Sequence, residues 1–153
     1  AITFDPELSS VPKGFVVSTI NWPGHADVEG DVVSIHLDHA SAATRRKQAA
    51  ELITTLQHRQ RPVILMGDFN SDWRENSTLR HISQALDLTA YRPEDTGLNT
   101  FPAFGQRLDW ILVSKGMAFR SYAVLPDPLS DHRGVLAELE LERDTHIRLA
   151  RTE

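Results

Sequence analysis

The sequence contains no cysteine in its 153 residues. This absence excludes disulfides, thiolate nucleophiles and zinc sites built on thiolates, and it leaves the redox compartment unassigned. No apolar run approaches the length that spans a bilayer, so we expect no stable membrane insertion. The first ten residues lack the basic and apolar regions of a secretory signal. That composition favours the cytoplasm without assigning a compartment.

Other absences narrow the class of protein. The formal net charge is -5, so the field of the whole molecule does not favour polyanions, although a local basic patch would act independently. No Gly-x-Ser-x-Gly motif is present, which argues against a serine hydrolase. The Gly-Asn-His-Asp and His-x-His motifs of calcineurin-like metallophosphoesterases are also missing. What remains is an ordinary globular composition whose length fits a single domain over residues 1–153.

The central stretch of the sequence is Pro-Val-Ile-Leu-Met-Gly-Asp-Phe-Asn at 62–70. Its apolar run, 63–66, predicts a strand that is buried on both faces. Gly67 permits a sharp turn, and Asp68 and Asn70 then follow the carboxyl end of the strand, where open α/β sheets bind ligands. Two interpretations stay open at this point. The pair either bonds to local backbone in an Asx-rich turn or converges on a phosphate with a divalent cation.

Periodicity and capping residues predict an α/β arrangement around this stretch. We expect strands at 15–20, 32–37, 63–66, 107–114, 119–125 and 135–141, and helices at 42–60 and 78–86. Ser41 and Ser77 are the expected N-caps of the helices. The order strand, helix, buried strand from 32 to 66 indicates a crossover connection.

The remaining segments are expected to be irregular. Residues 1–13 form a lead-in, 21–30 a polar loop within a hairpin, 88–106 a long loop, and 143–153 a charged tail. The basic cluster at 45–47 is interpreted as a solvated helix face, with a nucleic-acid contact as the alternative.

Several polar residues lie at or beside the predicted strands. Asp109 lies between Leu108 and Trp110, so it needs a partner, because a polar group in an apolar strand otherwise costs free energy. His132 is one candidate, and a salt bridge with Arg107 is the other. His36 is either a satisfied core histidine or a site residue. The other histidines are interpreted as surface residues, namely His25, His39, His58, His81 and His146.

Five short motifs occur in a characteristic order. They are Val-Val-Ser-Ile-His-Leu, Gly-Asp-Phe-Asn, Thr-Phe-Pro-Ala, Arg-Leu-Asp-Trp-Ile and Ser-Asp-His. Together they resemble the endonuclease/exonuclease/phosphatase family, which includes deoxyribonuclease I-like nucleases, abasic-site endonucleases, inositol-phosphate phosphatases and bacterial sphingomyelinases. The resemblance covers residues 14–141 and corresponds to the C-terminal portion of the family's domain.

The resemblance implies a fold, a cofactor and a metal site. The fold is a four-layer α/β sandwich in which two mixed sheets pack face to face with helices outside, here only its C-terminal part. The implied cofactor is Mg²⁺, with Mn²⁺ as an alternative, and the implied metal ligands are Asp68 and Asp131. The family's principal Glu ligand lies in an N-terminal half that has no counterpart here.

The resemblance also implies catalytic roles in phosphoester hydrolysis. His132 would contact the scissile phosphate and Asp109 would orient it. Asp68 would orient or deprotonate the attacking water, Asn70 would donate to a phosphate oxygen, and His36 would contact a non-bridging oxygen. This is catalysis by positioning and charge neutralisation.

The family resemblance also implies classes of substrate and of partner. The implied substrate is a phosphoester of a nucleic acid, an inositol phosphate or a phospholipid head group, chosen by loops at 21–30 and 91–105 that carry Trp22, Tyr91, Phe101 and Phe104. A truncated sandwich should expose an apolar sheet face, which the missing N-terminal half or self-association would cover. The alternative function is a non-catalytic fragment that only binds or assembles.

Overall fold

The computed structural model describes residues 1–4, 13–73, 77–126 and 130–142. The predicted tail at 143–153 lies outside these residues. The described elements are β1 (Ile2–Thr3), β2 (Gly14–Trp22), β3 (His25–His36), α1 (Ala42–Gln57), β4 (Val63–Asp68), α2 (Thr78–Ala85), β5 (Leu88–Ala90), the 3-10 turn η2 (Pro102–Phe104), β6 (Asp109–Ser114), β7 (Met117–Val124) and β8 (Val135–Leu141).

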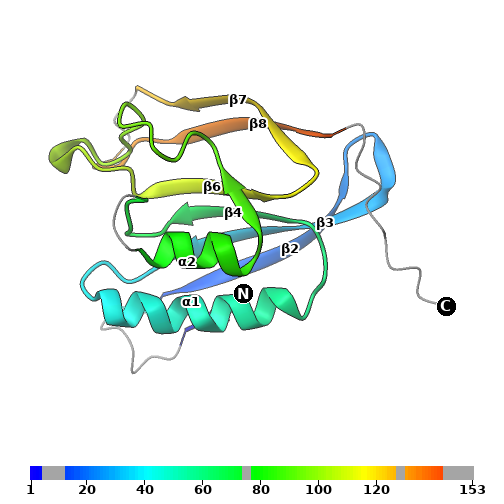
Figure 1. Cartoon of the computed structure of the whole chain (residues 1–153), viewed down its shortest axis with the longest axis horizontal. Helices are drawn as coiled ribbons and strands as arrows, with labels where there is room; N and C mark the ends of the chain where they lie inside the picture. The colour runs from blue at the N-terminus through cyan, green and yellow to red at the C-terminus, as the bar shows by residue number, and fades with distance from the viewer. Residues whose placement is uncertain (5–12, 74–76, 127–129, 143–153) are drawn as a thin grey trace.

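The structure confirms an α/β fold with two sheets. Six strands form a mixed sheet in the order β1-β2-β3-β4-β6-β5, and β7 and β8 form a two-stranded antiparallel sheet. Helices α1 and α2 lie on one face of the larger sheet, and β7–β8 lies on the other (Figure 1). The described residues therefore supply three layers of the expected four-layer sandwich, with the parallel pair β3–β4 joined through α1.

Both helices begin at the predicted caps. The Ser41 hydroxyl accepts from the Thr44 N–H, and the Ser77 hydroxyl accepts from the Arg80 N–H. Helix α1 ends at Gln57, earlier than expected, and Gln60 has already left the helical conformation with a φ of 53°. Neither helix is long and apolar enough to cross a membrane, and the same holds for every helix in the described part of the chain.

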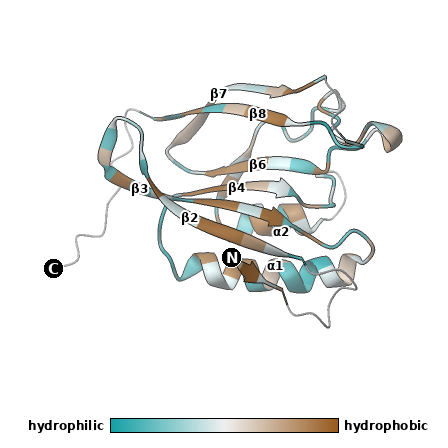
Figure 2. Ribbon diagram, turned by 180° about the vertical axis from the view of Figure 1, so that it is seen from behind, coloured by the Kyte–Doolittle hydropathy of each residue, from teal (hydrophilic) through white to brown (hydrophobic). Residues whose placement is uncertain are grey.

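The main core lies between the larger sheet and the helices. Alternate strand residues such as Phe15, Val33, Leu65 and Leu112 point to this side and are buried against Leu52 and its neighbours on α1. The hydrophobic colour runs along much of β2 (Figure 2). Strand residues of opposite parity point away from the helices, because successive side chains alternate between the faces of a sheet.

The opposite side of the sheet is only partly covered. Ile111, Val113 and Met117 are buried between β6 and the β7–β8 sheet. Further along the same face, Val16, Ile20 and Met66 remain 45%, 36% and 37% exposed. An exposed apolar strip of this kind is what the sequence led us to expect on the inner face.

Two loop predictions are wrong in detail. Residues 21–30 are not a long loop, because β2 and β3 continue to Trp22 and His25 and only Pro23 and Gly24 form the turn. This hairpin tip lies at the end of β3 opposite His36, so Trp22 packs beside the small core and does not face the predicted site. The segment 88–106 contains β5 and the η2 turn.

Candidate active site

One row across the larger sheet brings three of the predicted site residues together. His36, the last residue of β3, pairs in register with Asp68, the last residue of β4. Asp68 in turn pairs with Asp109, the first residue of β6. All three have the parity of the face turned away from the helices, because their neighbours Ile35 and Trp110 belong to the helix-side core.

Gly67 permits the close approach that this row requires. A Cβ on Gly67 would lie 2.0 Å from the Ile35 carbonyl oxygen, and its φ of 141° is one that side-chain-bearing residues rarely adopt. Only glycine therefore fits here. The residue that precedes Asp68 thus keeps β3 and β4 in the register that places His36 beside Asp68.

His132 reaches the row from the segment before β8. Its Nδ1 lies 2.7 Å from Asp109 Oδ2. The alternative partner for Asp109 is not used, because the Arg107 guanidinium lies 3.8 Å from the Trp110 ring centroid and donates to the Tyr122 hydroxyl at 2.8 Å. The histidine predicted from the sequence is thus the residue that the structure places on Asp109.

Asn70 holds the Asp68 carboxylate in place. Its backbone N–H donates to Asp68 Oδ1 at 2.8 Å, and its side-chain amide donates to Asp68 Oδ2 at 3.1 Å and to the Leu37 carbonyl at 3.0 Å. The left-handed φ of 47° at Asn70 allows both contacts at once. The first interpretation of this turn, local Asx bonding, is therefore confirmed, and the carboxylate that these bonds fix also lines a cleft.

His36 makes contacts on two sides. Its Nε2 lies 3.3 Å from Asp68 Oδ2 and 2.6 Å from Lys13 Nζ. The imidazole is about half exposed, so it is not a satisfied core histidine. The structure therefore supports the second of the two interpretations of His36, that of a residue open to a ligand.

The surroundings of the row raise the pKa of Asp68 and of His132 and lower the pKa of His36. Burial raises the pKa of Asp68, and the neighbouring Asp109 charge adds to this, while the Asn70 N–H opposes it. Burial lowers the pKa of His36, and the Asp68 charge opposes that change without reversing it. For His132, burial works to lower the pKa, but the hydrogen bond and charge of Asp109, with smaller contributions from Asp68 and Asp131, raise it above its ordinary value.

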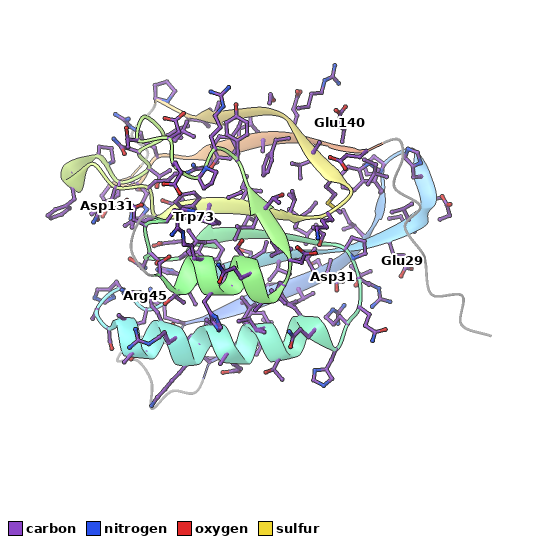
Figure 3. The ribbon with its side chains drawn as sticks, viewed as in Figure 1. Glu29, Asp31, Arg45, Trp73, Asp131 and Glu140 are labelled. Atoms are coloured by element: carbon purple, nitrogen blue, oxygen red, sulfur yellow. The ribbon has the colours of Figure 1, made fainter. Side chains whose placement is uncertain are left out.

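A cleft of about 830 Å³ opens over this row. Every predicted site residue lines it, namely His36, Asp68, Asn70, Asp109, Asp131 and His132. Asp131 and Arg45 lie at the same end of the molecule, whereas Glu29 and Asp31 lie at the other end (Figure 3).

The same cleft is lined by further residues that were not among the predicted catalytic and metal-binding residues, although Phe101 and Phe104 had been expected on a substrate-choosing loop. Lys13, His39 and Arg45 supply positively charged or titratable groups, and Phe101 and Phe104 supply an apolar wall. Arg45 had been assigned to a solvated helix face, yet its guanidinium turns back to donate to the Asp38 and His39 carbonyls. No local pattern in the sequence separates Arg45 from Arg46 and Lys47, which lie in the same basic cluster and do not line the cleft.

The described residues offer a donor set that fits a divalent cation. One ligand atom from each of Asp68, Asp109 and His132 lies within 4.8 Å of the others. Carboxylate oxygens suit Mg²⁺. Burial is the main cause of the raised pKa of Asp68, and the nearby charge of Asp109 adds to it. Asp131, the other predicted ligand, lines the cleft but does not belong to this convergent group.

Comparisons with known proteins identify the same fold. A model of the Endonuclease/Exonuclease/phosphatase family matches residues 5–132. The catalytic domain of human Nocturnin with bound sulfate is similar at 21% identity and a TM-score of 0.71, over 85% of this chain and 53% of that one. No curated protein matches the sequence significantly.

Two further similar structures are those of enzymes with other activities. A mannosyl-6-phosphatase of Bacteroides thetaiotaomicron is 20% identical with a TM-score of 0.68, over 86% of this chain and 58% of that one. Sphingomyelinase C of Streptomyces griseocarneus is 20% identical with a TM-score of 0.56, over 82% and 57%. Sequence identities this low show that the fold is shared, and they carry no conclusion about the substrate. The chain spans just over half the length of these structures.

Proposed function

The chain belongs to the endonuclease/exonuclease/phosphatase family, and we propose that it carries the acid–base residues of a metal-dependent phosphoesterase. The observation that supports this most strongly is the 2.7 Å contact between His132 and Asp109, next to Asp68 in one cleft. Phosphoryl transfer needs little covalent chemistry from the protein, so a few well-placed charged groups suffice.

His132 is the proposed donor to the phosphoryl group. An ionised carboxylate can only accept a hydrogen bond, so Asp109 fixes the hydrogen on Nδ1 and leaves Nε2 for the cleft. The raised pKa of His132 increases the fraction that is protonated near neutral pH. A protonated imidazole can donate to a phosphate oxygen or to the leaving group.

Asp68 is the proposed base for the attacking water. It ends β4 and lines the cleft, from where its carboxylate would orient or deprotonate the water. Asn70 holds the carboxylate through two bonds, which fixes its direction into the cleft. The neutral form of His36, favoured by its lowered pKa, would contact a non-bridging oxygen.

Asp68 and Asp131 are the proposed ligands of Mg²⁺, with Mn²⁺ as the alternative. Asp109 lies close enough to take part, but its Oδ2 already accepts from His132. Bound in this cleft, the cation would neutralise negative charge on the phosphoryl oxygens. Lys13 and Arg45, which line the same cleft, would add positive charge beside it.

The organic part of the substrate is proposed to pack on Phe101 and Phe104. Their rings stack with centroids 5.4 Å apart, and the Phe101 ring lies 4.8 Å from that of His132. Phe104 is 74% exposed, so its face is open to a ring or an apolar group. The candidate substrates are phosphoesters of a nucleic acid, an inositol phosphate or a phospholipid head group.

The proposal is tested by turnover on a panel of phosphomonoesters and phosphodiesters with Mg²⁺. In the active enzyme, His132→Ala should lower turnover by about 10²–10⁴-fold, the range for a general acid or base. His58→Ala is the matched control, because His58 caps the end of α1, its ring contacts the Thr54 carbonyl, and it does not line the cleft. Equal turnover in the two variants would refute the assignment.

A second candidate is a fragment that binds or assembles without catalysis. It is favoured by the exposed strip of Val16, Ile20 and Met66, an apolar surface that an assembly would cover. The 153 residues alone would then bind Mg²⁺ weakly and hydrolyse little. Calorimetric titration with Mg²⁺ beside the turnover assay separates the candidates, since tight one-to-one binding with substantial turnover would exclude the second.

A further inference from the structure

Thr100 lies in the irregular segment before β6 and is fully buried, at 0% exposure. A buried hydroxyl needs hydrogen-bond partners, because an unsatisfied one is costly. The Thr100 Oγ1 accepts from two consecutive backbone N–H groups, those of Leu108 and Asp109, each at 3.0 Å. The side chain thus fixes the first residue of β6, which carries the carboxylate of the site.

The position of Asp109 explains why such an acceptor is needed. On one side, Asp109 pairs with Asp68 of β4. On the other side, β5 runs beside β6 only as far as the pair Ala90 and Leu112, so it stops short of Asp109. Thr100 Oγ1 therefore supplies the acceptor that a longer neighbouring strand would have supplied.

The backbone of Thr100 reaches the other member of the pair. Its carbonyl accepts from the Arg133 N–H at 2.8 Å, and Arg133 directly follows His132. Its own N–H donates to the Gln106 carbonyl at 3.0 Å, which closes the turn that carries Phe104. One residue therefore bonds both to Asp109 and to the segment that presents His132.

We propose that Thr100 is a positioning residue that sets the distance between Asp109 and His132. It touches neither the cleft nor, by this account, the substrate, and it acts only through the two residues that it ties together. The inference rests on the proposed function for its kinetic consequence alone. Its structural consequence, the short Nδ1–Oδ2 contact, holds whether or not the chain is catalytic.

The test compares three substitutions. Thr100→Val keeps the branched shape and removes the acceptor, Thr100→Ser keeps the acceptor, and Ser83→Ala removes another buried hydroxyl that donates to the Leu88 carbonyl at 2.7 Å away from the site. Proton NMR observes the downfield Nδ1–H of His132, and hydrogen exchange follows the Asp109 amide.

Thr100→Val should shift or abolish the His132 resonance and speed exchange at Asp109, while Thr100→Ser and Ser83→Ala leave both unchanged. If Thr100 only stabilised the fold, Thr100→Val and Ser83→Ala would have the same small effect on the His132 resonance and on Asp109 exchange. That result would overturn the proposal. If Thr100→Val does not fold, Thr100→Cys replaces it, because a thiol is a weak acceptor of nearly the size of serine. A resonance identical in Thr100→Cys and Thr100→Ser overturns the proposal equally.

Kinetics give the second measurement. In the active enzyme, Thr100→Val should lower kcat by about 10-fold to 100-fold with little change in KM. The reason is that a misplaced catalytic pair stabilises the transition state less, while substrate binding is hardly affected. Thr100→Ser should restore kcat. If the resonances behave as expected in a protein that hydrolyses no phosphoester, the proposed function fails and the positioning role stands. Normal kcat in Thr100→Val overturns the role.

Discussion

The two faces of the larger sheet are built from the same strands and differ in how they are covered. On the helix side, Val33, Leu65 and Leu112 pair across three strands and all are fully buried. On the other side, the neighbouring row runs from Val16 through Met66 to Ile111, with exposures of 45%, 37% and 9%. Coverage there improves only toward β6, on which the β7–β8 sheet packs.

The difference shows that the main apolar core and the charged residues of the cleft lie on opposite faces of the sheet. A closed apolar layer holds the strands in register, and that register alone places His36, Asp68 and Asp109 side by side on the opposite face. The cleft lies where the second sheet leaves the first uncovered, so charged groups there keep access to water and to a substrate. Substitutions on the two faces should therefore separate into effects on folding and effects on function.

The largest difference in stability is expected between two adjacent residues of β4. Leu65→Ala leaves a cavity in the helix-side core and should lower the free energy of unfolding by about 2–5 kcal/mol. Met66→Ala, on the open face, should cost about 1 kcal/mol or less. Urea unfolding followed by circular dichroism measures both. Equal losses would mean that the two faces are equally packed.

A smaller effect is expected at the end of the sheet away from the cleft. Asp31 is buried and accepts from Arg59 Nε at 2.6 Å and from the Thr19 hydroxyl at 2.8 Å. Arg59→Met leaves the carboxylate without its cation and should lower the free energy of unfolding by about 1–3 kcal/mol at pH 7. Turnover should not change, because the pair does not line the cleft.

The stability that the Asp31–Arg59 ion pair contributes should depend on pH. Burial alone would raise the pKa of Asp31, but the bonds from Arg59 and Thr19 and the charge of Arg59 bring it below its ordinary value. A lowered pKa contributes stability above the unfolded pKa of about 4, and that contribution disappears as pH falls through the folded value. The difference between wild type and Arg59→Met should therefore be full at pH 7 and shrink below about pH 4. A difference that is constant from pH 7 to pH 2 would exclude this ion pair as its source.

The smallest change in stability is expected for the exposed strip. Val16→Thr keeps the shape of the side chain and should alter the free energy of unfolding by about 0.5 kcal/mol or less. It should weaken any self-association of the chain, because it removes apolar surface that a second copy would cover. Val17→Thr, on the helix side, is the matched control and should leave association unchanged. Sedimentation velocity measures the association state of each protein. A wild-type chain that stays monomeric at every concentration contradicts self-association.

Much of the fold was predictable because apolar periodicity and capping residues act locally. The caps Ser41 and Ser77 were found on these grounds, and strand 63–66 was found from its continuous apolar run. Its predicted burial on both faces is wrong, because Met66 is 37% exposed on the face away from the helices. The β2–β3 hairpin was misread because its outer arms extend beyond the core and carry no hydrophobic period. The Pro23-Gly24 pair was the available signal, since Gly24 adopts a φ of 81° that tight turns require.

The site was predictable only in part. Asp68 and Asn70 were predicted as polar residues that follow a strand, and Asp109 as a polar residue within one, although the structure places it at the start of β6. The partner of Asp109 was narrowed to a histidine or an arginine. The choice depends on tertiary packing, because Trp110 and Tyr122 hold the Arg107 guanidinium away from Asp109. Lys13 and Arg45 enter the cleft through strand register and side-chain reach, which no local pattern in the sequence encodes.

The central claim is that Asp109 and His132 work as one unit on the open face, and a double-mutant cycle on turnover tests it most directly. Asp109→Asn, His132→Ala and the double variant are compared with wild type in the active enzyme. The account predicts that the double variant loses no more than the more damaging single variant, about 10²–10⁴-fold, because members of a unit are not additive. Losses that multiply, or a single variant with normal turnover, would contradict it.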